Sequence, residues 1–220
     1  MMQNDPAASL PAKQKERTPV YTFARGVAAV VVHVLFPIKY HGLEHFDIKA
    51  PYILMSNHQS LLDPFAVAYP CKDYEVRFLG KKEICKTKLV AWFADKLHMI
   101  QVDRHNTDLN AMRQCVKALR NNQVLGIFPE GTRHHDDLMS TIETGTAVLA
   151  LRANVPLLPM YMDKKLKLFR RTNVYVGAPM DISDLCAQGM DAQVVEALTG
   201  RIRDTYLAMR ADTLKALPGK

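Results

Sequence analysis

Hydrophobic residues follow two spacings along this chain, and their alternation predicts one sheet flanked by helices. Short apolar runs rich in β-branched residues, bounded by Pro, Gly or polar residues, are typical of buried strands. We expect such strands at residues 52–55, 76–79, 99–102, 124–128, 155–161 and 173–176. Apolar positions at helical spacing predict helices at residues 64–68, 88–96, 108–121, 145–152 and 191–214. Because helices and strands alternate, we expect the α/β class, with a single mixed sheet.

The first forty residues differ in character from the rest. Residues 1–17 are polar and contain Pro and Lys, so we expect a disordered tail. Residues 18–40 carry an apolar run that Pro37 ends, and at about ten residues it is too short to cross a bilayer, which takes about 20. With Arg25 and Lys39 flanking it, the run predicts a membrane-associating helical segment that lies in one leaflet. The alternative is a helix that packs on the core. Residues 41–220 then form the main domain.

The segment Asn57–Asp63 carries candidate chemistry, because a carboxylate follows a histidine five residues on. On a regular helix His58 and Asp63 would point about 140° apart and could not easily meet. Here an apolar strand precedes His58, and we expect Asp63 to be the N-cap of a helix that begins with Pro64. A histidine in that loop can reach the carboxylate and act as a base that Asp63 orients. Taken alone, such a pair is more often only a structural hydrogen bond.

A second segment, Phe128–Arg133, follows another apolar run. Pro129 ends that strand, and the turn after it lies where open α/β sheets usually bind ligands, at the carboxyl end of a strand. Gly131 lets the backbone approach a ligand closely, and Arg133 offers a planar fork of donors to a phosphate. The alternative is an ordinary turn with a surface Glu–Arg pair.

Together these segments resemble the four ordered motifs of the 1-acylglycerol-3-phosphate acyltransferases, over roughly residues 40 to 180. The motifs here are 57–63, 100–104, 128–133 and 155–159, of which the first and third in combination are specific. The resemblance implies a glycerolphosphate acyltransferase-like fold over residues 41–220. It makes His58 the catalytic base and Asp63 its orienter. It also implies a substrate phosphate site formed by Lys81, Arg104, Glu130, Gly131, Thr132 and Arg133.

The activity that the resemblance implies is transfer of a fatty acyl group from acyl-CoA or acyl carrier protein to the sn-2 hydroxyl of 1-acyl-sn-glycerol-3-phosphate, which gives phosphatidic acid. It implies no cofactor and places the protein on the cytoplasmic face of the cell membrane, peripheral or monotopic. Residues 142–145 put the acceptor headgroup in question, because Glu143 stands where many relatives carry a basic residue. The alternatives are another lysophospholipid or hydroxylated lipid as acceptor, an ester or thioester hydrolase that uses the same dyad, and a lipid-binding protein without turnover.

Composition agrees with this class without choosing within it. A formal net charge of +7 over 220 residues favours an anionic partner, such as a phospholipid surface or an acidic carrier protein. No nucleic-acid-binding module is recognisable, so we expect no nucleic acid partner. The four cysteines form no Cys-x-x-Cys pair, which is typical of reduced thiols. The run His134–Asp137 is more typical of a solvated loop than of a metal site, and we expect no metal.

Overall fold

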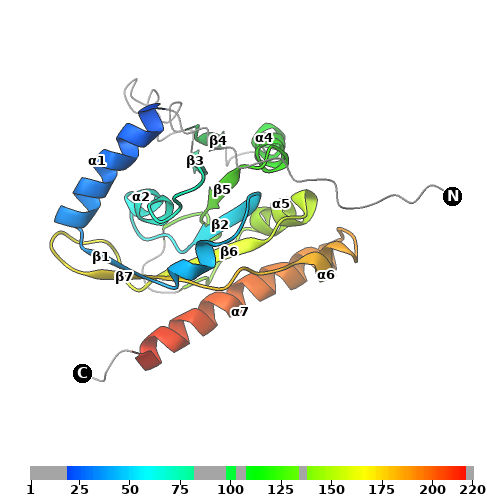
Figure 1. The fold of residues 1–220 in the computed structure, drawn as a ribbon. Helices are drawn as coiled ribbons and strands as arrows, with labels where there is room; N and C mark the ends of the chain where they lie inside the picture. Colours follow the sequence, from blue (N-terminus) through cyan, green and yellow to red (C-terminus); the bar gives the residue numbers. More distant parts are fainter. Residues whose placement is uncertain (1–18, 82–97, 103–107, 134–137, 217–220) are drawn as a thin grey trace.

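The structure is a computed structural model that describes residues 19–81, 98–102, 108–133 and 138–216 (Figure 1). Its centre is a seven-stranded sheet in the order β1-β7-β6-β2-β5-β3-β4. All neighbouring strands are parallel except β6 and β7, which are antiparallel. The predicted single mixed sheet is therefore confirmed. The strands are β1 (Ile38–His41), β2 (Tyr52–Ser56), β3 (Val76–Lys81), β4 (Ile100–Val102), β5 (Val124–Ile127), β6 (Leu157–Met162) and β7 (Thr172–Val176).

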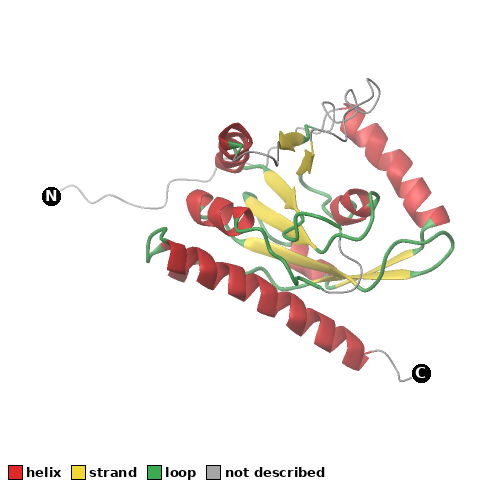
Figure 2. Cartoon of the chain, turned by 180° about the vertical axis from the view of Figure 1, so that it is seen from behind, coloured by secondary structure: helices red, strands yellow, loops and turns green. Residues whose placement is uncertain are grey.

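Helices cover both faces of the sheet (Figures 1 and 2). On one face lie α4 (Leu109–Arg120), α5 (Gly145–Ala153) and α7 (Ala192–Ala216). On the other face lie α2 (Asp63–Ala68) and, packed against it, α1 (Pro19–Leu35). Two short helices, η1 (Leu43–Phe46) and α6 (Ser183–Cys186), lie in connections.

The central strands are buried on both sides, which is why they appear in the sequence as continuous apolar runs. In β2, Ile53 and Met55 pack in the cluster with α4, α5 and α7, whereas Tyr52 and Leu54 pack in the cluster with α2. This alternation is the two-residue period of a strand. It divides the core into one apolar layer on each face of the sheet.

The N-terminal segment differs from the prediction of one helical stretch over 18–40. The helix α1 ends at Leu35, because Pro37 has no N–H to continue it, and the chain then forms the edge strand β1 beside β7. A four-residue, half-buried edge strand gives too weak an apolar pattern to be recognised in advance. Near its start, α1 is tied to the body by Tyr21, a buried residue whose hydroxyl accepts a hydrogen bond from the Val76 amide at 3.2 Å. Within the described ranges, none of the helices is both long and apolar enough to cross a bilayer.

Other predicted boundaries shift by a few residues. The strand expected from Val155 begins at Leu157, just after Pro156, which has no N–H to donate to a neighbouring strand. Asp63 is the first residue of α2 and not its N-cap, which is Leu62, and no side chain caps that helix. The helix expected at 88–96 and the tail at 1–17 lie outside the described residues.

Candidate active site

The candidate site lies where β2 and β5 leave the sheet side by side. These two strands are parallel neighbours with Met55 opposite Ile127, so the segments that follow them start at the same edge. Asn57, the first residue after β2, is buried and makes two hydrogen bonds to the end of β6. Its amide nitrogen donates to the Met162 carbonyl at 3.1 Å, and its oxygen accepts from the Met162 amide at 2.8 Å. This bridge fixes the start of the loop that carries His58.

His58 and Asp63 meet as the sequence predicted. The distance from His58 Nδ1 to Asp63 Oδ2 is 3.0 Å, with the carboxylate fully buried and the imidazole partly open to solvent. Since a buried carboxylate accepts, Nδ1 carries the proton, and Nε2 is left with a lone pair. Within the described part of the chain, Nε2 has no hydrogen-bond partner. The imidazole is therefore oriented as a base whose reactive nitrogen points away from its orienter.

Asp63 does more than orient the ring. The same Oδ2 atom accepts hydrogen bonds from the backbone amides of Gln59 and Ser60, each at 2.6 Å. The carboxylate thus closes the loop onto the first turn of α2 and holds His58 in place. Its other oxygen, Oδ1, is buried and has no partner among the described residues. The three hydrogen bonds to this carboxylate therefore all fall on the oxygen that faces the imidazole.

The carboxylate of Glu130 joins the second motif to the first. It is buried, and its two oxygens accept hydrogen bonds from the His58 amide at 2.8 Å and the Met139 amide at 3.0 Å. Its charge also acts on Tyr206 of α7: burial first, and the Glu130 carboxylate second, raise the pKa of the Tyr206 hydroxyl well above its usual value. In this arrangement Glu130 faces the dyad loop.

The turn around Gly131 needs a residue without a side chain. Gly131 has a φ of +68°, a left-handed conformation, and an added Cβ would lie 2.6 Å from Cγ of Glu143. Phe128, which begins this turn, stacks on the His58 ring with centroids 4.1 Å apart and an angle of 22° between the planes. Phe78 of β3 in turn stacks on Phe128, with centroids 5.9 Å apart. One face of the His58 ring is thereby covered by an aromatic side chain.

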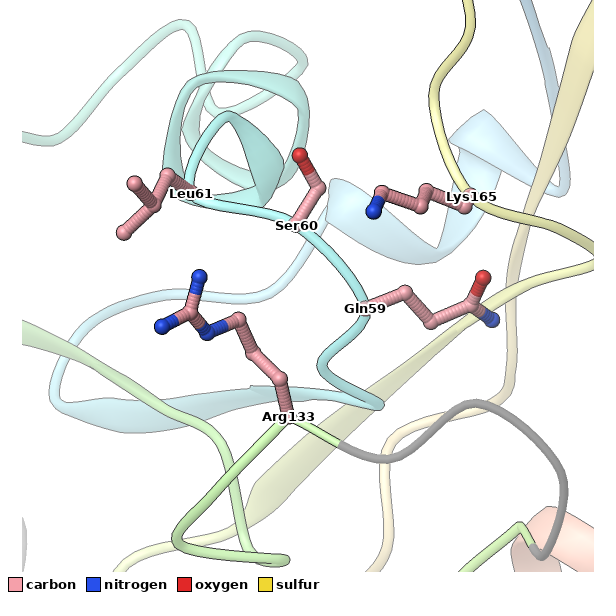
Figure 3. A pocket seen from close by; sticks show the side chains of 5 residues that line it. All are labelled: Gln59, Ser60, Leu61, Arg133 and Lys165. Carbon is pink, nitrogen blue, oxygen red and sulfur yellow. The ribbon is translucent and has the colours of Figure 1, made fainter.

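Beside the dyad loop is a pocket of about 440 Å³ with two cations in its lining (Figure 3). Its lining residues are Gln59, Ser60, Leu61, Arg133 and Lys165. Arg133, from the turn after β5, and Lys165, from the connection after β6, extend toward the loop from different elements (Figure 3). The loop that carries His58 therefore also forms a wall of a pocket suited to an anion.

The other residues of the predicted phosphate site come from different parts of the chain. Lys81 is the last residue of β3, at the same edge of the sheet, and pairs in register with Val102 of β4. Thr132 is exposed in the turn beside Arg133. Arg104 lies outside the described residues. Where the described ranges run, no three His, Cys, Asp or Glu side chains gather closely enough to hold a metal ion.

Sequence reasoning gave no role of their own at this site to four residues: Asn57, Gln59 and Phe128, which lie within the two motifs, and Lys165. A polar residue directly after a fully apolar strand, such as Asn57, is a usable signal, because a buried amide must find partners. No local pattern indicates that Phe128 would stack on the histidine or that Lys165 would line the pocket. Their roles depend on which strands become neighbours in the sheet, and that is a property of the fold.

The fold and the site define an α/β protein with a hydrogen-bonded histidine–aspartate pair at the carboxyl edge of the sheet, beside a cationic pocket. Comparison with known proteins gives this class a family. The chain belongs to the acyltransferase family, whose model matches residues 37–163, a span that includes both the dyad and the turn that carries Arg133. The predicted resemblance is confirmed.

Curated relatives agree with this assignment over most of the chain. It is similar to the 1-acyl-sn-glycerol-3-phosphate acyltransferase of Bacillus subtilis, with 24% identity over 84% of this chain and 96% of that protein. It is also similar to the enzyme of the same name from Streptococcus pneumoniae, with 27% identity over 88% of this chain and 74% of that protein. The crystal structure of the 1-acyl-sn-glycerophosphate acyltransferase of Thermotoga maritima matches with a TM-score of 0.67 and 21% identity over 91% of this chain and 80% of that one, a likeness of fold.

Proposed function

We propose that this acyltransferase moves a fatty acyl group from a thioester donor to the sn-2 hydroxyl of 1-acyl-sn-glycerol-3-phosphate, which yields phosphatidic acid. The observation that carries the proposal is the shared loop: residues 57–63 hold the dyad, and Gln59 and Ser60 of the same loop line the cationic pocket. An acceptor with a phosphate and a nearby hydroxyl fits such a pair of sites. The names of the two bacterial relatives supply the acceptor.

The chemistry follows from the geometry of the dyad. Nε2 of His58 takes the proton of the sn-2 hydroxyl as its oxygen attacks the thioester carbonyl, and Asp63 stabilises the imidazolium that forms. When the tetrahedral intermediate collapses, a C–O bond has formed, the C–S bond breaks, and the imidazolium returns its proton to the departing thiolate. General base help of this kind contributes roughly 10²- to 10⁴-fold in rate. The step needs no nucleophilic side chain and no cofactor.

The phosphate of the acceptor is assigned to the pocket beside the loop. Arg133 can bind it with two parallel N–H donors, and Lys165 adds a second cation. We extend the site to Lys81, Thr132 and Arg104 on the strength of the family motifs. Gly131 contributes the turn that brings Arg133 to the pocket.

Glu130 takes a positioning role in this proposal. With both oxygens on backbone amides, it holds His58 in register with the turn after β5. A carboxylate beside a bound phosphate would otherwise repel it.

The donor is acyl-CoA or acyl carrier protein, since both present a thioester to the same nucleophile.

The enzyme works at the membrane surface on the cytoplasmic face, where its two-tailed product stays. The stripe of Phe23, Val27, Val30 and Val34 along α1 supports this, because these apolar side chains fall on one side of the helix and are exposed. Such a helix can lie in one leaflet with the dyad edge turned toward the lipid.

The experiment incubates the purified protein with 1-acyl-sn-glycerol-3-phosphate and a radiolabelled acyl donor, first acyl-CoA and then acyl carrier protein, and separates the lipids. Labelled phosphatidic acid supports the proposal and identifies the donor. Labelled free fatty acid that forms at the same rate with and without acceptor makes the protein a thioester hydrolase. A product that forms equally well on acceptors without a phosphate contradicts the acceptor assignment.

A further inference from the structure

The connection between β6 and β7 combines exposed apolar residues with a dense positive charge. Leu168 and Phe169 stand at its tip with 57% and 73% of their surface exposed, a costly position for large apolar side chains in water. Five basic residues flank them, and all five are exposed: Lys164, Lys165, Lys167, Arg170 and Arg171. We call residues 164–171 the basic hairpin.

The basic hairpin lies against the end of α1. The amide of Phe169 donates a hydrogen bond of 2.7 Å to the carbonyl of Leu35, the last residue of that helix. Figures 1 and 2 both show the connection reaching that end of the helix. Val34, one residue before this contact, belongs to the exposed apolar stripe of α1. The tip of the basic hairpin therefore continues an apolar surface that begins on the helix.

Charge is not balanced within the basic hairpin. Among the described residues, the acidic group beside it is Asp163, which lies 3.8 Å from Nζ of Lys164. The two oxygens of Asp163 also accept hydrogen bonds from the backbone and side-chain nitrogens of Asn173, at 2.9 and 2.8 Å. One carboxylate cannot neutralise five cations, so this surface keeps a strong positive potential.

We propose that the basic hairpin is a second membrane contact, which binds the anionic surface of a phospholipid bilayer while Leu168 and Phe169 enter the boundary between headgroups and acyl chains. The proposal rests on the proposed function, in which α1 is the first contact. Two features favour a bilayer over a soluble anionic ligand. Apolar residues stand between the cations at the tip, and the apolar surface is continuous with the stripe on α1.

A groove links the basic hairpin with the candidate active site. This cavity of about 590 Å³ is lined by Gln59, Asp163, Lys164, Lys165, Lys167, Arg170 and Arg171. Gln59 and Lys165 line both this groove and the pocket of Arg133. With the basic hairpin on the bilayer, an anionic headgroup can move from the leaflet along a continuous row of cations to the site. The hairpin thus binds the membrane where the substrate enters.

The test measures sedimentation of the full chain with vesicles of phosphatidylcholine alone and of equal parts phosphatidylcholine and phosphatidylglycerol. Two variants remove the apolar and the charged parts separately: Leu168→Ala with Phe169→Ala, and Arg170→Ala with Arg171→Ala. The control, Leu214→Ala with Lys215→Ala, removes an exposed apolar residue and an exposed cation from α7. Each basic residue near an anionic surface contributes roughly fivefold to partitioning, so loss of both arginines should lower binding to anionic vesicles by about 25-fold at low salt. High salt should reduce that difference.

We expect the apolar variant to bind both kinds of vesicle roughly tenfold less. The charged variant should lose binding to the anionic vesicles alone, and the control should bind like the wild type. Turnover on detergent-dispersed substrate reports separately on the proposed function, because that reaction needs no bilayer. Unchanged vesicle binding by both variants overturns the inference. The inference is also overturned if the arginine variant binds vesicles like the wild type and has a raised KM for the thioester donor in detergent. That result would assign the groove to the donor.

Discussion

Replacing Asp63 with Asn tests the dyad with the smallest change of shape. The substitution removes the negative charge and keeps a side chain of the same size in a fully buried position. An Asn in a dyad can turn its NH2 group toward the imidazole and force the wrong tautomer. Here the amides of Gln59 and Ser60, each 2.6 Å from Oδ2, require an acceptor on that side and hold the Asn oxygen there. The proton should therefore stay on Nδ1 of His58, and only the charge is lost.

The magnitude follows from the 3.0 Å distance between Nδ1 and Oδ2. The centres of the imidazolium and carboxylate charges lie about 4 Å apart, which corresponds to about 4 kcal/mol at an effective dielectric constant of 20. An asparagine oxygen recovers part of this as a dipole, so we expect kcat to fall by about 10²- to 10³-fold. Loss of charge-assisted hydrogen bonds should cost about 1–2 kcal/mol in unfolding free energy, equivalent to a fall of roughly 2–8 °C in Tm.

The assay measures phosphatidic acid formation from saturating substrates, with a thermal denaturation curve for each variant. The matched control is Glu75→Gln, because Glu75 pairs with His98 at 2.9 Å just before the start of β3, at the opposite edge of the sheet. The control should leave kcat within about twofold of the wild type, since no reacting group lies there. A folded Asp63→Asn enzyme with wild-type kcat would refute the role of the charge. A fall in kcat as large as that of a variant without His58 would refute the claim that the proton stays on Nδ1 of His58.

Three further predictions follow from individual contacts. Arg133→Lys should raise KM for 1-acyl-sn-glycerol-3-phosphate at least tenfold and leave KM for a neutral monoacylglycerol nearly unchanged, because an ammonium cannot form the bidentate fork; equal losses on both acceptors would make Arg133 structural. Gly131→Ala should lower the free energy of unfolding by about 2–4 kcal/mol, because the new Cβ clashes with Glu143 and the backbone is left-handed. Gly189→Ala has the left-handed strain without the clash and should cost about 1 kcal/mol. Equal losses for the two variants would contradict a close contact between residue 131 and Glu143. Burial raises the pKa of the Cys115 thiol to about 12, so at pH 8 only roughly one thiol in 10⁴ is ionised. Iodoacetamide should therefore leave Cys115 unmodified, as checked by mass spectrometry, and leave the enzyme active, as checked by assay. Inactivation by alkylation of Cys115 would contradict a mechanism without a thiol.

Much of the fold could be predicted because the central strands carry strong local signals. The apolar runs that became β2 and β5 are bounded by Pro, Gly or polar residues, and both lie within a residue of their predicted limits. The edge strand β1 could not be predicted in this way. Its four residues, three half-buried and one exposed, gain their structure from pairing with β7, more than a hundred residues later, and no local pattern reports such a partner.

The candidate site divides along the same line. The meeting of His58 and Asp63 could be predicted from the strand, loop and helix of residues 52–68. The roles of Glu130 and Lys165 could not, because each depends on contacts between distant strands. Glu130 looked like part of a phosphate site, and only the register of β2 and β5 turns its carboxylate to the His58 amide.

The N-terminal segment bears on how a truncation should be designed. Deleting residues 1–40 would remove most of β1 together with α1, so a loss of activity would not report on the membrane. Substituting Val30 and Val34 with Ser keeps the strand and changes only exposed side chains. That variant should sediment less with vesicles and retain its turnover in detergent. Unchanged sedimentation would leave the exposed stripe without a role in membrane binding.

The most direct test of the central claim compares phosphatidic acid formation by the wild type and by His58→Ala, with labelled acyl donor and 1-acyl-sn-glycerol-3-phosphate in detergent. His98→Ala serves as the control, because it removes the histidine of the second His–carboxylate pair at the far edge of the sheet. We predict that His58→Ala keeps its fold by circular dichroism and loses at least about 10³-fold in kcat, while His98→Ala retains activity. Substantial phosphatidic acid formation by a folded His58→Ala protein would contradict base catalysis by His58.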